Sequence, residues 1–189
     1  EKAKYGHPRN VEQYLIYRHC LLYKDVAKDT ALINTDPTIR FYIRDEQKEK
    51  EREEKLLKAR QTAMRNYVEV LGDDTKFNSI YVQCCVNQGF NLTEYSLKTK
   101  YEKEKVLLDY SNDKPEKFNK LCSDKFISTK ALIEMLIARG ELSRSELNQN
   151  IYTSDGDFIA ANIKEAVVYF NNPENKDIRT SYENKLKMF

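Results

Sequence analysis

The sequence has few of the residues on which enzymes and cofactor-binding proteins usually depend. Its 189 residues include only 5 glycines and 2 histidines. No glycine pattern corresponds to G-x-x-x-x-G-K-[ST], G-x-G-x-x-G or G-x-S-x-G, so nothing indicates a phosphate-binding loop or a hydrolase nucleophile. With His7 and His19 as the only histidines, candidates for a general base are scarce. We therefore expect a protein that is not an enzyme and binds no cofactor.

The cysteines do not form a pattern typical of catalysis, metal binding or a disulfide framework. His19 and Cys20 are neighbours, and neighbouring side chains on a helix point about 100° apart, which places them poorly as base and nucleophile. No C-x-x-C or H-x-x-x-H spacing occurs. The sequence predicts no metal site, and it indicates a reducing compartment for the four cysteines, Cys20, Cys84, Cys85 and Cys122.

Long hydrophobic runs and a charge excess of one sign are also missing. A composition of 40% hydrophobic and 33% charged residues, without an apolar run near 18 residues, predicts a water-soluble globular protein with no membrane span. The 32 basic and 30 acidic residues give a net charge of +2, so no global field attracts nucleic acid or anionic lipid. Because the chain begins at Glu1 rather than Met, we expect a fragment, a processed form or the ordered part of a longer protein.

The strongest local pattern is one long charged helix over about residues 45–71. This segment contains no Gly or Pro and is rich in good helix-forming residues. Its second half carries apolar residues about every 3.5 positions, whereas residues 45–55 contain none. We expect the second half to pack on the body of the protein and the first half to project into solvent or contact a partner. The candidate partner-binding residues are Glu46, Lys48, Lys50, Glu51, Arg52 and Lys55.

The rest of the chain predicts a mainly α protein, a multi-helix bundle with a small β-hairpin at about 150–160. The Ser154 to Asp157 turn contains Asp-Gly, which readily takes the positive φ angles of a tight turn. The loop-like stretch Ser111 to Lys114, followed by Pro115, predicts a boundary between a helical region, 1–112, and a helical subdomain, 115–189, although one continuous domain remains open. Further helices are expected at about 10–24, between Asp74 and Gly89, from Thr93 through Leu108, at 115–123, 127–139 and 163–171, and from beyond Pro173 to the carboxyl end. Residues 26–32 are expected to add another helical turn or two, and residues 38–43 to form a short strand or an extended lead-in.

The region after Pro115 also suggests nucleic-acid binding, which we retain as an alternative. Two helices followed by a hairpin resemble part of a winged helix-turn-helix, whose second helix enters the major groove. That second helix, however, offers mostly Ala, Leu, Ile and Met, with Glu134 expected to be exposed and Arg139 at its end. Asp155 and Asp157 in the hairpin would repel phosphates. Nucleic acid is therefore the less favoured partner.

Three segments together resemble a family. FYIRDEQKEKEREEKLLKARQTAMRNYVEVLGDDTKF, EKFNKLCSDKFISTKALIEMLIARGEL and GDFIAANIKEAVVYFNNPEN follow one another over about residues 40–175. In style and order they are similar to uncharacterised virion-associated proteins of large tailed bacteriophages. The resemblance implies a multi-copy structural or assembly role at a head, neck or tail junction, located in the virion or the host cytoplasm. Its implied partners are other protein subunits, as a homo-oligomer or with virion proteins, and it supplies no site residues.

Overall fold

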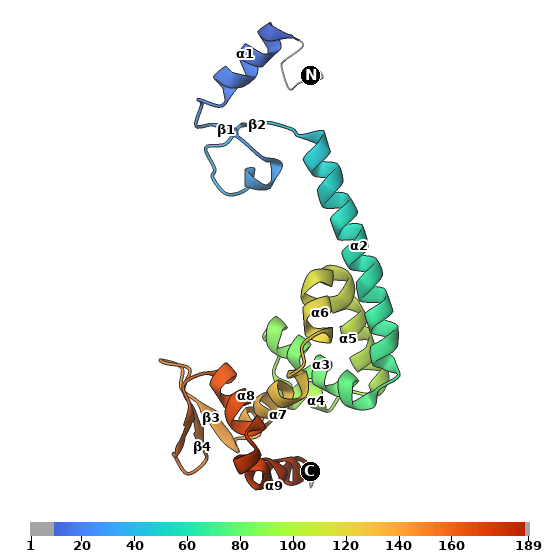
Figure 1. Cartoon of the computed structure of the whole chain (residues 1–189), viewed down its shortest axis with the longest axis vertical. Helices are drawn as coiled ribbons and strands as arrows, with labels where there is room; N and C mark the ends of the chain where they lie inside the picture. Colours follow the sequence, from blue (N-terminus) through green and yellow to red (C-terminus); the bar gives the residue numbers. More distant parts are fainter. Residues whose placement is uncertain (1–9, 188–189) are drawn as a thin grey trace. The chain divides into compact units, whose positions relative to one another are not determined.

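A computed structural model describes residues 10–187, and the chain divides into two compact units. Unit 1 extends to Lys55 and unit 2 begins at Leu56. Among the described residues, 9 α-helices and a small three-stranded antiparallel sheet account for most of the regular structure (Figure 1). The prediction of a mainly α bundle with one long charged helix and a small hairpin is confirmed.

Unit 1 consists of short elements. Asn10 caps helix α1, Val11–Cys20, by accepting a hydrogen bond from the Gln13 amide at 3.1 Å. This helix ends before Leu22, so it is shorter than the predicted 10–24. Val26–Ala27 forms strand β1 and not the expected helical turn, because it pairs in parallel with β2, Phe41–Tyr42, a partner distant in the sequence. Strand β2 lies inside the segment 38–43, which was expected to be a short strand or an extended lead-in. A short 3-10 helix, Thr30–Leu32, lies between the two strands.

Helix α2, Glu46–Leu71, is the long charged helix predicted from the sequence. The Asp45 carboxylate accepts a hydrogen bond from the Lys48 amide at 3.2 Å, which satisfies one free donor of the first turn. In the second half, Ala63 and Val70 are buried in a hydrophobic cluster. Only part of the expected apolar stripe is covered, because Leu56, Leu57, Met64 and Val68 remain exposed.

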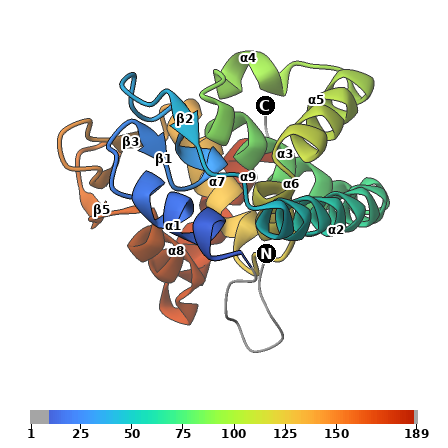
Figure 2. The ribbon, with the colours of Figure 1, turned by 90° about the horizontal axis from the view of Figure 1, so that it is seen from above.

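The first half of unit 2 is helical and shares one hydrophobic cluster. It contains α3, Asp74–Gln88, α4, Leu92–Ser96, α5, Lys100–Asp113, α6, Pro115–Cys122, and α7, Ile127–Ala138. The single helix predicted from Thr93 is in fact two, α4 and α5, which Figure 2 shows as separate helices joined by a turn. Thr99 and Glu102 form a capping box that starts α5 as a new helix. Consequently Leu97 lies between the helices and is 84% exposed.

The second half of unit 2 packs a small sheet and two helices around another cluster. Strands β3, Leu142–Arg144, β4, Ile151–Thr153, and β5, Phe158–Ala160, follow in this order in an antiparallel sheet. The predicted hairpin corresponds to β4 and β5, and Gly156 takes a φ of 94° in its turn. Helices α8, Ile163–Asn171, and α9, Lys176–Lys187, complete the unit, with a 3-10 turn, Pro173–Asn175, between them.

The structure divides the chain at a different place from the predicted boundary at Ser111 to Lys114. Helix α5 continues through Asp113 and α6 starts at Pro115, so this stretch is a helix junction rather than a linker. Phe118 of α6 lies in the same hydrophobic cluster as Leu107 of α5. The division falls instead beside Lys55, where the run of residues without apolar side chains ends. Among residues 10–187, no helix is both long and apolar enough to cross a bilayer.

Candidate protein-interaction surface

The six charged residues predicted to bind a partner are all exposed, but they do not share one face of α2. At 100° per residue, Glu46 and Lys50 lie on one side of the helix and Lys48 and Arg52 on nearly the opposite side. Glu51 and Lys55 lie between these two sides, next to the second pair. A flat partner could therefore contact only some of them at once.

Arg52 is already engaged within unit 1. Its guanidinium donates to the Asp29 carboxylate at 2.5 Å and to the Thr30 hydroxyl at 3.2 Å. The hydrogen bond with Asp29 raises the pKa of Arg52 above its already high ordinary value. Glu51 accepts a hydrogen bond from Gln47 at 3.3 Å. The first half of α2 is thus helical as predicted, but part of its charge binds residues of its own chain.

The apolar side chains of unit 1 form a more prominent surface than the charged ones. Helix α1 has no buried residue. Among the described residues of unit 1, Ala27 is the only buried hydrophobic residue, at 4% exposure. We call the exposed large side chains of this unit the apolar surface of unit 1. Its members are Val11, Tyr14, Leu15, Ile16, Tyr17, Leu22, Tyr23, Leu32, Phe41 and Tyr42.

The sequence predicted a helix at about 10–24 but not this exposed apolar surface. Val11 and Leu15 are four residues apart and share a face of α1, for which burial inside the same protein is the usual outcome. The available signal was that Ile16 and Tyr17 place further apolar side chains outside that face. A helix with apolar side chains on more than one face needs more than one neighbouring element to bury them. Residues 10–55 contain no such body.

The structure does not bring His19 and Cys20 together as a catalytic pair. The His19 Nε2 atom is hydrogen-bonded to the Tyr23 hydroxyl at 3.0 Å, and the two rings meet edge to face at 5.1 Å. Cys20 is half-buried. His7, the other histidine, lies outside the described residues. The His19 side chain therefore stabilises the end of α1 by contacting Tyr23 one turn later.

The remaining cysteines are thiols in apolar surroundings. Burial raises the pKa of Cys84 and of Cys85, and raises that of Cys122 to about 11. A thiol with a raised pKa is a poor nucleophile near neutral pH. Within residues 10–187, no three His, Cys, Asp or Glu side chains come close enough to hold a metal ion.

Helix α7, the helix considered for nucleic-acid recognition, lies in the centre of unit 2. It packs against α3, α8 and β3. Glu134, which was expected to be exposed, is only 8% exposed, and it accepts a hydrogen bond from Arg144 of β3 at 2.6 Å. The sequence expectation was wrong because β3, whose cation faces Glu134, was not foreseen. The buried side chains of α7 cannot enter a groove of DNA.

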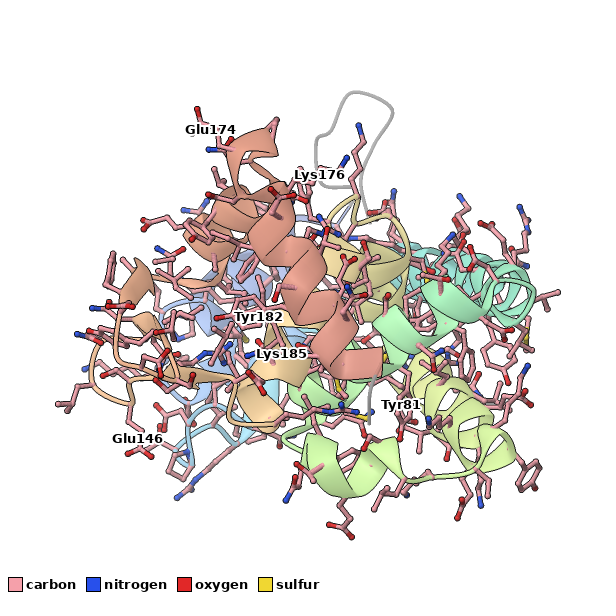
Figure 3. The ribbon with its side chains drawn as sticks, turned by 90° about the horizontal axis from the view of Figure 1, so that it is seen from below. Tyr81, Glu146, Glu174, Lys176, Tyr182 and Lys185 are labelled. Atoms are coloured by element: carbon pink, nitrogen blue, oxygen red, sulfur yellow. The ribbon has the colours of Figure 1, made fainter. Side chains whose placement is uncertain are left out.

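A groove of about 760 Å³ lies between α3, α4, α7 and α9. Its wall includes Tyr81 from α3, which Figure 3 labels, and Met135 from α7. The Tyr81 hydroxyl donates to the Tyr95 carbonyl at 2.8 Å. This hydroxyl is thus occupied by a structural contact. The groove contains no arrangement of groups that indicates a reaction.

No protein-family model, curated protein or solved structure matches the chain. The residues and contacts of the chain itself must therefore support any functional proposal.

Proposed function

We propose that this chain is a non-enzymatic structural or assembly protein that binds other protein subunits through unit 1. The observation that carries the proposal is the apolar surface of unit 1, which has ten large exposed side chains beside a single buried hydrophobic residue, Ala27. Single exposed apolar residues are common on soluble proteins. A unit with ten exposed large apolar side chains, and with none buried among its described residues, is characteristic of a surface that another protein covers.

The size of this surface suits a protein interface. Each of its ten side chains exposes on the order of 100 Å², so together they expose roughly 1,000 Å². A standard protein interface buries about 800 Å² on each partner. Area alone does not set affinity, so the comparison means that unit 1 exposes enough apolar surface for an interface of ordinary size.

The charged residues of α2 would form the rim of such an interface. Interfaces typically surround an apolar centre with polar side chains that remain partly hydrated and set specificity. Glu46 and Lys50 suit this role because they are exposed on the side of α2 away from Arg52. Lys48, Glu51 and Lys55 could contribute from the other faces, whereas Arg52 already binds Asp29.

The resemblance of three segments to virion-associated proteins supports a more specific setting. In that setting the chain is a multi-copy component of a phage particle, at a head, neck or tail junction, and its partners are other virion proteins. The test is mass spectrometry of gradient-purified particles of the virus that encodes the chain. We expect the protein in the particles in several copies, and its absence from them would refute the particle role.

A matched pair of variants tests the surface itself. Phe41→Glu introduces a charge into the apolar surface of unit 1, and Leu97→Glu introduces the same charge at an exposed leucine of unit 2. We expect only Phe41→Glu to reduce incorporation into particles. Equal incorporation of both variants would show that this surface is not the contact.

Nucleic-acid binding remains the alternative proposal, supported by the order α6, α7 and a small sheet. The burial of α7 speaks against it. We expect no binding to mixed DNA and RNA at low salt. Binding that weakened with salt at a log-log slope near −0.9 per phosphate contact would favour the alternative instead.

A further inference from the structure

We infer that the α1 part of the apolar surface of unit 1 is covered by a second copy of this chain, through antiparallel pairing of the two α1 helices about a twofold axis at Leu15. The inference rests on the proposed function and deepens it by naming the partner. Leu15 is 60% exposed near the middle of α1. On a twofold axis each Leu15 contacts its own equivalent, as an isologous interface requires.

The charge of unit 1 favours a protein of the same composition over a polyanion. Residues 10–55 contain nine basic and ten acidic residues, so the described part of the unit is close to neutral. A nucleic acid or an anionic membrane needs a basic surface around any apolar contact. A surface with nearly balanced charges can instead complement a copy of itself.

The positions of two charges within α1 select the antiparallel arrangement. Glu12 lies three residues before Leu15 and Arg18 three residues after it. In an antiparallel pair centred on Leu15, Glu12 of each copy lies opposite Arg18 of the other, and this happens twice. In a parallel pair, Glu12 would face Glu12 and Arg18 would face Arg18. Neither residue forms an ion pair with any described residue of its own chain, so both remain available.

The helix dipoles also favour the antiparallel arrangement. Glu12 is in the first turn of α1, and Arg18 is in its last turn. Antiparallel helices place the positive N-terminal end of one beside the negative C-terminal end of the other. Val11 lies one turn before Leu15, on the same face, and extends the apolar contact on both sides of the axis.

The test is sedimentation velocity of the full chain over a wide concentration range. We expect a reversible monomer to dimer transition. Leu15→Glu places two carboxylates against each other at the axis and should weaken the dimer about 100-fold or more, whereas Leu97→Glu should leave it unchanged. Circular dichroism confirms that each variant keeps its helices, which is expected because both leucines are exposed.

Charge reversal then tests the orientation. Glu12→Arg and Arg18→Glu each replace two attractive contacts by two repulsive ones, so each should weaken the dimer about tenfold. The double variant restores the attractive contacts with the charges exchanged, and its affinity should return to near that of the original chain. Failure of the double variant to recover would overturn the antiparallel pairing.

The outcomes separate this inference from the function on which it rests. A chain that stays monomeric at every concentration, yet is present in purified particles, overturns the second-copy inference and leaves the assembly role standing. A dimer that Leu15→Glu abolishes, in a protein absent from particles, supports the inference and refutes the particle role. A dimer insensitive to Leu15→Glu overturns the inference directly.

Discussion

The ion pair between Glu134 of α7 and Arg144 of β3 should stabilise unit 2 more than the other ion pairs on its surface. The Glu134 side chain is 10% exposed, that of Arg144 is 27% exposed, and the atoms lie 2.6 Å apart. Removing one partner of a fully buried pair costs about 3–5 kcal/mol, because the other charge is left buried without compensation. Since water partly hydrates Arg144, we expect a loss of about 2–3 kcal/mol in the free energy of unfolding.

The two single substitutions should not be equally destabilising, because Glu134 is more buried than Arg144. Arg144→Gln leaves the more buried charge, Glu134, without its cation, so it should destabilise the protein more than Glu134→Gln does. The double variant leaves no unpaired charge and should cost less than the sum of the single variants.

Urea unfolding of the four proteins, followed by circular dichroism, measures this double-mutant cycle. The comparison is Glu183→Gln on α9: the Glu183 side chain is 39% exposed against 10% for Glu134, and it pairs with Arg179 one helical turn away, so its removal should cost only about 0.3–0.5 kcal/mol. Additive effects of the two single substitutions at Glu134 and Arg144, or losses no larger than those on α9, would refute the reasoning.

Three other measurements test the division of the chain, a helix end and a thiol. A fragment of residues 56–189 should unfold within about 1 kcal/mol of the monomeric full chain, because both hydrophobic clusters lie in unit 2; a loss of several kcal/mol in urea unfolding would contradict the division. Gly89→Ala should lower the free energy of unfolding by about 1–2 kcal/mol, because Gly89 ends α3 at a φ of 72°. Gly72 has no positive φ, so Gly72→Ala is the control and should cost less than half as much in thermal unfolding. Burial raises the folded-state pKa of Cys122 to about 11 from an ordinary 9.0, so the contribution of the neutral thiol to stability is complete below pH 9 and is lost as pH rises through 11. The loss of stability at alkaline pH should therefore be smaller in Cys122→Ala. An identical loss in both proteins would exclude this thiol as a contributor.

The elements that depend on residues close together in the sequence were predicted well. The long helix α2 was foreseen because a run of helix-forming residues without Gly or Pro needs no tertiary contact to indicate a helix. The hairpin of β4 and β5 was foreseen from its Asp-Gly turn. The helix at 163–171 was foreseen, and Asn162 caps it as α8 by accepting hydrogen bonds from the Lys164 and Glu165 amides.

Features that depend on distant residues were not predicted. Glu134 was expected at the surface because its helical neighbours do not reveal that Arg144, ten residues later, will face it. The break between α4 and α5 was missed because apolar spacing continued through Leu97, which the structure leaves exposed. The candidate charged residues all lie on α2, but they surround the helix instead of sharing a face.

The sequence by itself determined the mainly α fold and the helical state of the charged segment, since both follow from propensities and patterns that act within a few residues. Only the tertiary structure decided which apolar side chains are covered. It buried those of α3 and α7 within unit 2 and left those of α1 exposed. The physical reason is that burial requires a second surface, and a periodic apolar pattern does not specify whether that surface belongs to the same chain or to another molecule.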